Sequence, residues 1–288
     1  MRDYVIIADS SCDLPKETIK NWGIECIEMK YRFDDENADR GNYELTAKEF
    51  YEKIRSGRSS KTSAINSEEF KEFFTPFLKE GKDVIYLSFS SGLSATYNFS
   101  VIACEELKEQ FPERKIISVD TLCESAGYGL LVYLAKNKAD SGANIEELAE
   151  YVKETGPKVC HWFTVDDLMH LKRGGRISPT VALAGTVLGI KPILHMNDEG
   201  KLVNIEKVRG RKASFERLAQ KVAETGLDPK NSPVFLSHGD CYDDAMQVVS
   251  ILKKKYGIKT ESISEIGPVI GSHSGPGTIA IFFLGKER

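Results

Sequence analysis

His273 is the side chain best suited to acid–base chemistry or anion binding in this chain of 288 residues. It lies in GSHSGPG near the C-terminal end, within an otherwise strand-like apolar stretch at residues 266–283. The glycines on both sides indicate special backbone dihedrals or a close approach of another segment, because ordinary strand packing does not require them. We interpret His273 as a candidate site residue. A histidine that is merely satisfied inside a turn is the open alternative.

Hydroxyl side chains gather in four segments, three of which directly follow apolar runs typical of strands. The segments are residues 9–15 (DSSCDLP), 61–67 (KTSAINS), 88–97 (SFSSGLSATY) and 118–129 (SVDTLCESAGYG). In an open parallel sheet, ligands bind beyond the carboxyl ends of the strands, where helix N-termini favour an anion. Converging hydroxyls would therefore form an uncharged binding site for a carboxylate or phosphate. Each could instead be a helix N-cap, the commoner role of such residues.

Motifs for several other chemistries are absent from the sequence. There is no G-x-x-x-x-G-K-[ST] loop, and GYG at residues 127–129 lacks the third glycine of a dinucleotide fingerprint. We discount a nucleophile pair at Ser237 and His238, because neighbouring residues on a strand point to opposite faces. A hydrolase that uses Ser94 with His273 is a weak alternative, because no G-x-S-x-G elbow is present.

Composition and charge exclude further classes of protein. Six cysteines without a C-x-x-C pair and five histidines without metal spacing predict reduced thiols and no metal site. A formal net charge of -4 with no long basic run argues against a nucleic-acid partner. The first apolar run is too short for a signal peptide or a membrane span, so we expect a cytoplasmic protein.

Two basic clusters are the remaining candidates for anion contacts. LKRGGRIS at residues 171–178 contains Arg173 and Arg176, and EKVRGRK at residues 206–212 contains Arg209 and Arg211. Such clusters are usually solvated faces. Guanidinium groups nevertheless suit phosphate recognition, so a phosphate-bearing ligand or partner stays open.

The first half of the chain must position these residues with a parallel sheet. Apolar runs in YVIIADS, DVIYLSFS and KIISVDT alternate with amphipathic segments, the order typical of parallel strands with crossover helices. A helix is predicted after a cap at Asn66, with Glu69 three residues further on, ending at Gly81 and bent or shortened by Pro76. Further helices are expected at about residues 96–110 and 124–139.

The pattern changes at Gly156 and Pro157, where we place a domain boundary. This predicts an N-terminal domain at residues 1–157 and a C-terminal domain at residues 158–288. The second half predicts a mixed α/β structure with a hairpin near residues 195–210, a helix from Lys212, a strand at PVFLSHGD and a closing strand at GTIAIFFLG. Small residues dominate residues 179–194, which could pack in a core or line a narrow apolar channel.

The ordered blocks ADSSCDLP, KTSAINSEEF, SSGLSATY, VDTLCESAGYG, DDLMHLKRGGRIS, GIKPIL, HGD and IGPVIGSHSGPGTIAIFF span the chain. Together they resemble the DegV family from end to end. The resemblance implies a two-domain α/β fold, with a parallel-sheet N-terminal domain, a mixed α/β C-terminal domain and a ligand cleft between them. It also implies a cytoplasmic fatty-acid-binding protein of phospholipid metabolism, the acyl-carrying subunit of a bacterial fatty acid kinase.

The same resemblance implies which residues act. Thr62, Ser94 and His273 would contact the carboxylate of a long-chain fatty acid, while Arg176 and Arg209 would meet a partner or a phosphate. Catalysis would belong to a separate ATP-dependent fatty acid kinase subunit, so no catalytic residue, cofactor or metal is expected, and transient membrane contact is compatible with this role. The alternative is an enzyme or kinase subunit that acts on a small polar anion such as a sugar phosphate.

Overall fold

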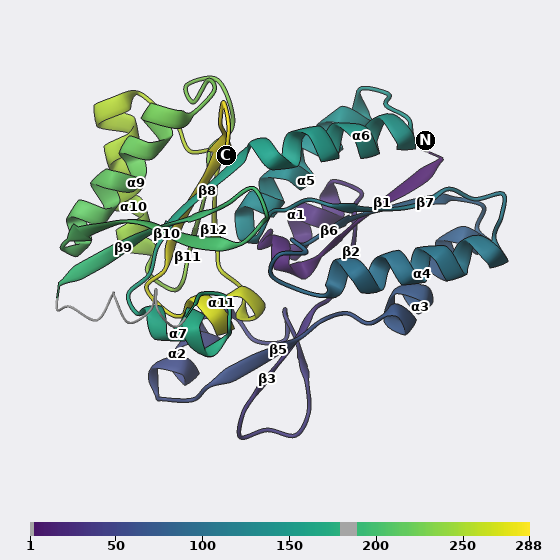
Figure 1. Ribbon diagram of the computed structural model, residues 1–288, viewed down its shortest axis with the longest axis horizontal. Coiled ribbons are helices and arrows are strands. Elements are labelled where there is room, and N and C mark those ends of the chain that lie inside the picture. The colour runs from purple at the N-terminus through teal and green to yellow at the C-terminus, as the bar shows by residue number, and fades with distance from the viewer. Residues whose placement is uncertain (1–2, 179–188) are drawn as a thin grey trace.

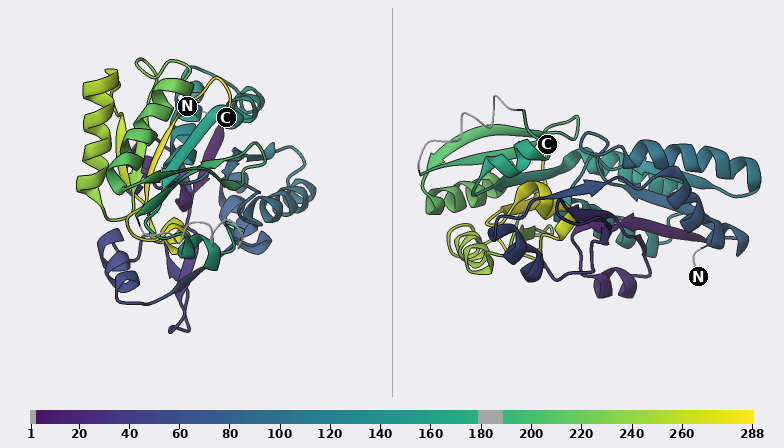
Figure 2. Two further views of the ribbon diagram at one scale, coloured as in Figure 1. Left: turned by 60° about the vertical axis from the view of Figure 1, so that its left-hand side comes forward. Right: turned by 90° about the horizontal axis from the view of Figure 1, so that it is seen from below.

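The computed structural model describes residues 3–178 and 189–288, which form three sheets (Figures 1 and 2). The first sheet is fully parallel and has the strand order β2-β1-β6-β7. Its strands are β1 (Tyr4–Asp9), β2 (Glu25–Ile27), β6 (Asp83–Ser88) and β7 (Ile116–Asp120). The three strands predicted from apolar runs are therefore confirmed. The short edge strand β2 was not predicted from the sequence.

Helices cover both faces of this parallel sheet. They are α1 (Lys16–Asn21), α3 (Ser67–Lys79), α4 (Thr96–Gln110), α5 (Ser125–Asp140) and α6 (Ile145–Thr155). One face packs against α3 and α4 through Val84 and Tyr86, and the other against α5 and α6 through Ile85 and Leu87. This alternation follows from the two-residue period of a strand, and burial of both faces explains why its strands read as continuous apolar runs.

Helix α3 begins with the predicted cap. The Asn66 side chain accepts a hydrogen bond from the Glu69 amide at 3.0 Å, and the Glu69 carboxylate accepts one from the Asn66 amide at 2.9 Å. The helix continues through Pro76 to Lys79, so the expectation that proline shortens it is wrong. The segment instead buries Phe70 and Phe74, and this packing outweighs the one hydrogen bond that proline removes.

A small antiparallel sheet that the sequence did not predict lies beside the parallel one. It has the order β4-β3-β5, with β3 (Lys30–Phe33), β4 (Arg40–Gly41) and β5 (Ser60–Ser63), and α2 (Ala47–Arg55) packs against it. In its register Tyr31 lies opposite Thr62. The sheet thus fixes Thr62 on a strand, where the sequence suggested only a loop.

The third sheet belongs wholly to the second half of the chain, and its order is β10-β9-β8-β13-β11-β12. Its strands are β8 (Val159–Thr164), β9 (Ile190–Met196), β10 (Leu202–Arg209), β11 (Phe235–His238), β12 (Ser262–Glu265) and β13 (Ile279–Leu284). All neighbours are antiparallel except β11 and β12. The predicted hairpin is the β9–β10 pair.

The helices of the second half pack on this sheet or beside it. They are α7 (Leu168–Arg173), α9 (Arg211–Thr225), α10 (Tyr242–Ile251) and α11 (Pro268–Ser274). The chain also contains the short helical segments η1 (Ser10–Cys12), η2 (Gly156–Lys158) and η3 (Leu252–Tyr256). Helices α9 and α10 cover one face of the sheet, while α5 from the first half contacts β8, β11 and β13. In Figure 1 the C-terminal sheet and the parallel sheet lie at opposite ends, with β3 and β5 beside their junction.

The strand-like reading of residues 266–283 is wrong in its first part. Residues Pro268–Ser274 form the helix α11, and only Ile279–Leu284 form a strand. Pro268 occupies the first turn of the helix, where its missing N–H has no intrahelical role, and Gly275 (φ 77°) ends it. His273 therefore projects from the last turn of a short helix. Residues 179–188, the larger part of the small-residue run, lie outside the described residues. Its last part belongs to β9 (Ile190–Met196).

All strands of the first two sheets precede residue 157, and all strands of the third follow residue 158. One apolar core nevertheless continues through both segments, with Leu130 and Val132 of α5 in the same cluster as Phe163 and Phe282. The division into domains at 157/158 stays a prediction. Within the described part of the chain, no helix has the length and apolar character needed to cross a membrane.

Candidate functional site

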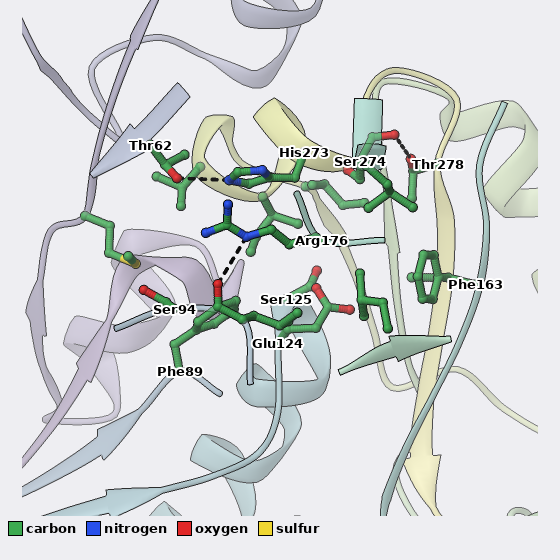
Figure 3. Close-up of a pocket in the computed structure, with 18 residues that line it drawn as sticks. Thr62, Phe89, Ser94, Glu124, Ser125, Phe163, Arg176, His273, Ser274 and Thr278 are labelled. Atoms are coloured by element: carbon green, nitrogen blue, oxygen red, sulfur yellow. Dashed lines mark hydrogen bonds between the residues drawn. The ribbon is translucent and has the colours of Figure 1, made fainter. Parts of the chain in front are cut away.

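A narrow cavity lies where the three sheets meet (Figure 3). Its walls are mostly apolar and come from both halves of the chain, including Phe89, Leu93, Phe163, Leu171, Leu202 and Ile270. Such a lining favours a ligand that is largely hydrocarbon.

Thr62 and His273 form the polar wall of the cavity. Thr62 Oγ1, on β5, lies 2.9 Å from His273 Nε2, on α11, so residues 211 positions apart meet in one hydrogen bond. Burial, together with a smaller effect of the nearby Arg176 guanidinium, lowers the pKa of His273 to about 3. The imidazole is therefore neutral at physiological pH, and its Nδ1 has no hydrogen-bond partner among the described residues.

A glycine makes room for this imidazole. A Cβ atom on Gly174, the residue that ends α7, would lie 2.1 Å from His273 Nδ1. Any side chain at this position would displace the ring, since real Cβ contacts are never so close. The first glycine of the GG pair between the basic residues is therefore required by its packing against His273.

Ser94 lines the cavity from the loop before α4. Its hydroxyl lies 2.8 Å from Thr96 Oγ1 and accepts a hydrogen bond from the Thr96 amide at 3.2 Å. The hydroxyl therefore stabilises the start of the helix, as the alternative interpretation held, and also faces the cavity. A hydroxyl oxygen that already accepts can still donate its proton to an anion.

Arg176 follows α7 and reaches the same wall. Its Nε donates to the Leu93 carbonyl at 3.1 Å, and its Nη1 donates to the Gly174 carbonyl. Burial lowers the pKa of Arg176, although guanidinium groups remain charged in proteins. This cation is thus held beside His273 and Leu93 by neutral carbonyl groups.

A second, polar pocket, the outer pocket, adjoins the cavity. Thr62, Arg176 and His273 line both spaces. The outer pocket adds Arg58, Lys61, Asp34, His170 and Arg173. The structure therefore places three of the predicted residues on a wall that separates an apolar space from a largely basic one, with Ser94 on the apolar side.

Arg209 lies apart from this group. It is exposed at the end of β10, where it pairs with Ile190, and it is not among the described residues that line either space. A role for Arg209 in contacting a partner stays a prediction.

Two acidic residues near the cavity were missed at the sequence level. Glu124, at the start of α5, is only 7% exposed and lines the cavity, and burial raises the pKa of its carboxyl to about 8. Asp13 accepts hydrogen bonds from Ser125 Oγ at 2.6 Å and from the Gly267 amide at 2.9 Å, and burial raises its pKa to about 7. Both residues lie in segments that we selected for their hydroxyl side chains. They were not selected themselves, because a charged residue before a helix is expected to face solvent.

The described residues contain no cluster of three or more histidine, cysteine, aspartate or glutamate side chains that could hold a metal ion. The site can instead hold an anion by hydrogen bonds from hydroxyl groups, an imidazole and a guanidinium, with an apolar tail beyond it.

A family model described as "Uncharacterised protein, DegV family" matches residues 3–286. The chain belongs to the DegV family. A DegV domain-containing protein of Clostridium perfringens is 45% identical over 289 aligned positions, covering 100% of this chain and 99% of that protein. The resemblance read from the ordered motifs is therefore confirmed.

Solved DegV structures share the fold along the whole chain. A fatty acid binding DegV family protein from Streptococcus agalactiae superposes with a TM-score of 0.85 at 30% identity, covering 100% of both chains. A DegV family protein from Thermus thermophilus, described by its fatty acid binding, gives a TM-score of 0.86 at 28% identity, covering 99% of this chain and 100% of that one. The two-domain DegV fold predicted for this chain is confirmed.

Proposed function

We propose that this DegV protein binds a long-chain fatty acid and presents its carboxylate to a separate ATP-dependent kinase subunit, which forms the acyl phosphate. In this role the protein is a carrier with no catalysis of its own and needs no cofactor. Because the kinase needs ATP, the carrier would work in the cytoplasm. Its fatty-acid-binding DegV relatives support the ligand, and the kinase partner is what the resemblance to the family implies.

The observation that carries the proposal is the shared wall of the two spaces. Thr62, Arg176 and His273 line both the apolar cavity and the basic outer pocket. A fatty acid with its tail in the cavity would bring its carboxylate to this wall. The outer pocket would then leave room on the far side of the carboxylate for an incoming phosphoryl group, which basic residues stabilise.

Burial of the tail would supply most of the affinity. At about 0.8 kcal/mol per methylene, a long acyl chain gains on the order of 10 kcal/mol before ordering costs. Hydrogen bonds at the head group contribute about 1 kcal/mol each, so they orient the carboxylate more than they retain the lipid. Presentation and retention are therefore separable properties.

Ser94→Ala tests this separation. The variant should retain bound fatty acid within a few-fold of the native protein but lose at least tenfold in acyl-phosphate formation with the kinase subunit, because a misplaced carboxylate reacts poorly. The two measurements are displacement of a fluorescent fatty acid and ATP-dependent acyl-phosphate formation. Ser91→Ala, at an exposed serine of the same loop, is the matched control and should change neither. Equal loss of retention and phosphorylation in Ser94→Ala contradicts the proposal.

The polar outer pocket favours one rival, a protein that acts on a small anion such as a sugar phosphate. This rival gives the apolar cavity no ligand. Titration calorimetry decides between the two: the proposal predicts fatty acid binding with no detectable binding of sugar phosphates, and the reverse pattern supports the rival.

A further inference from the structure

Glu124 is an acidic side chain on the mostly apolar wall of the cavity. Its carboxyl group faces the cavity in Figure 3, on the side away from Thr62. The side chain is more than nine-tenths buried. The same lining includes Phe89, Phe163 and Ala280. A saturated hydrocarbon chain in this space would bring only methylene groups to the Glu124 carboxyl.

Among the described residues, no hydrogen bond reaches the Glu124 carboxyl. The hydrogen bonds of Glu124 are all made by its backbone: the amide donates to His161 Nε2 at 3.2 Å, and the carbonyl accepts from the amides of Gly127 and Tyr128. The neighbouring Ser125 hydroxyl donates to Asp13 and contacts Ser237 Oγ at 3.1 Å. Arg176 donates to backbone carbonyls of Leu93 and Gly174. None of these groups satisfies the Glu124 carboxyl.

A buried polar group without a partner costs free energy, typically more than a satisfied hydrogen bond contributes. A ligand that supplies the missing partner is therefore favoured over one that does not, and a site built around a polar group rejects ligands that lack the matching group. The apolar surroundings also disfavour a charged ligand group at this depth. An uncharged oxygen on the acyl chain, as a hydroxyl or a keto group, meets both conditions.

We propose that Glu124 is a specificity-determining residue that selects fatty acids carrying a hydroxyl or oxo group on the chain. A neutral carboxyl group donates its proton to either oxygen and can accept from a hydroxyl. The inference rests on the proposed function, because it assigns the chemical class of the acid that the carrier holds. It adds a second point of polar contact, in the cavity, to the carboxylate contacts at Thr62, Ser94 and His273.

The test compares stearic acid with its positional hydroxy and oxo isomers in a displacement assay on delipidated protein. The native protein should bind at least one oxygenated isomer about tenfold more tightly than stearic acid, the factor expected for one net hydrogen bond. Glu124→Leu should bind stearic acid more tightly than the oxygenated isomers. Glu124→Gln, which keeps an uncharged donor and acceptor of similar size, should preserve the preference and serves as the second variant if Glu124→Leu folds poorly.

Ser94→Ala is the control for the head group, and it should weaken stearic acid and its isomers alike. Equal affinity of the native protein for stearic acid and every isomer overturns the inference and leaves the carrier function standing. The inference is also overturned if Glu124→Leu still binds an oxygenated isomer more tightly than stearic acid. Failure of every acid to bind the native protein overturns both the carrier function and the inference.

Discussion

The neutral state of His273 decides how this residue can serve an acid head group. Burial and the adjacent guanidinium lower the pKa of His273 to about 3, so the imidazole that contacts Thr62 is uncharged at neutral pH. A carboxylate placed against this ring would raise the pKa of His273. In the proposed role His273 would enter the site as a neutral hydrogen-bond partner, and Arg176 would supply the fixed positive charge.

The buried carboxyl of Glu124 makes the stability of the protein depend on pH. Its pKa is raised from 4.5 to about 8 by burial, so the folded protein holds this proton more tightly than the unfolded chain. That contribution to the free energy of unfolding is fully present below about pH 4.5 and is lost as pH rises through about 8. Glu124→Gln has no such proton, so the variant should gain stability relative to the native protein as pH rises.

Urea unfolding between pH 5 and pH 9 measures this difference, which should reach on the order of a few kcal/mol at the alkaline end. The comparison cancels the opposite contribution of His161, whose pKa is lowered by burial and which destabilises the fold as pH falls. Parallel pH profiles for the two proteins would show that Glu124 ionises freely in the folded state.

Sequence reasoning marked most residues of the candidate site. His273 was chosen from its glycine-rich surroundings, Ser94 lay in a hydroxyl segment after a predicted strand, and Thr62 lay in one before a predicted helix. Glu124 could not be found in this way, because its burial depends on β8 and β13 packing against the start of α5. Arg209 was chosen by resemblance, and the structure places it exposed at the end of β10, outside the described lining of both spaces.

At the scale of elements, the contact between α7 and α11 shapes the head-group wall. The last turn of α11 carries His273, and the end of α7 supplies Gly174 against that ring. The sequence did not predict α11, because a seven-residue helix that starts at proline and contains glycine lacks the length and periodicity that identify helices. The antiparallel sheet of β3, β4 and β5 was not predicted for a similar reason, because its strands are short and partly polar.

Gly174→Ala tests this contact. Its backbone is helical, so alanine adds no conformational strain, but the new methyl group would overlap the His273 imidazole. We expect fatty acid affinity to fall at least several-fold and the unfolding free energy to change by about 1 to 3 kcal/mol, the usual cost of overpacking. Displacement titration and urea unfolding measure the two quantities.

Gly175→Ala is the matched control for this substitution. Gly175 has φ +69° and open space around its Cβ position, so alanine there adds backbone strain without a steric contact. It should cost stability with little loss of affinity. If Gly174→Ala and Gly175→Ala affected affinity equally, the proposed steric link from α7 to His273 would be wrong.

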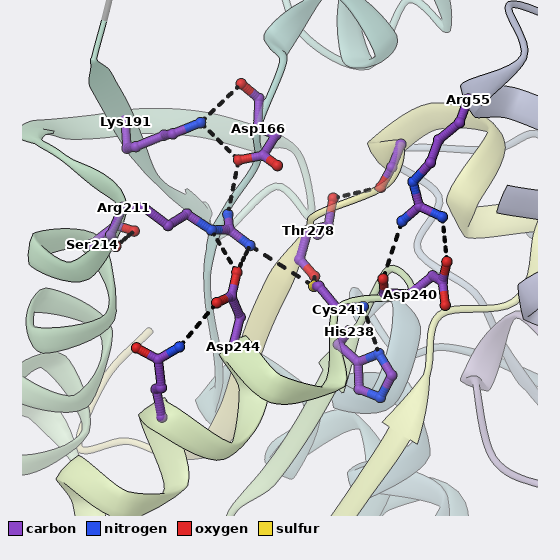
Figure 4. Close-up of polar contacts among 12 residues, drawn as sticks. Arg55, Asp166, Lys191, Arg211, Ser214, His238, Asp240, Cys241, Asp244 and Thr278 are labelled. Atoms are coloured by element: carbon purple, nitrogen blue, oxygen red, sulfur yellow. Dashed lines mark hydrogen bonds and ion pairs between the residues drawn. The ribbon is translucent and has the colours of Figure 1, made fainter. Parts of the chain in front are cut away.

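The whole molecule holds its cavity between two segments that are tied together at several points. Arg55 of α2 pairs with Asp240 after β11, and Tyr51 donates to the Ile266 carbonyl at 3.1 Å. Figure 4 shows this pair beside a network in which Arg211 contacts both Asp166 and Asp244. The contacts of Arg55 and Tyr51 join α2 to the second half of the chain, and the Arg211 network joins α9, α10 and the segment after β8 within that half.

The central claim is that one molecule of fatty acid lies in this cavity with its carboxylate at Thr62, Ser94 and His273. Native mass spectrometry of gently purified protein, followed by extraction and chromatography of the released ligand, tests it most directly. We expect a one-to-one complex whose mass exceeds that of the protein by one long-chain fatty acid; the complex should disappear on delipidation and return when acid is added. Protein that carries no lipid after gentle purification and takes up none when fatty acid is added would contradict it.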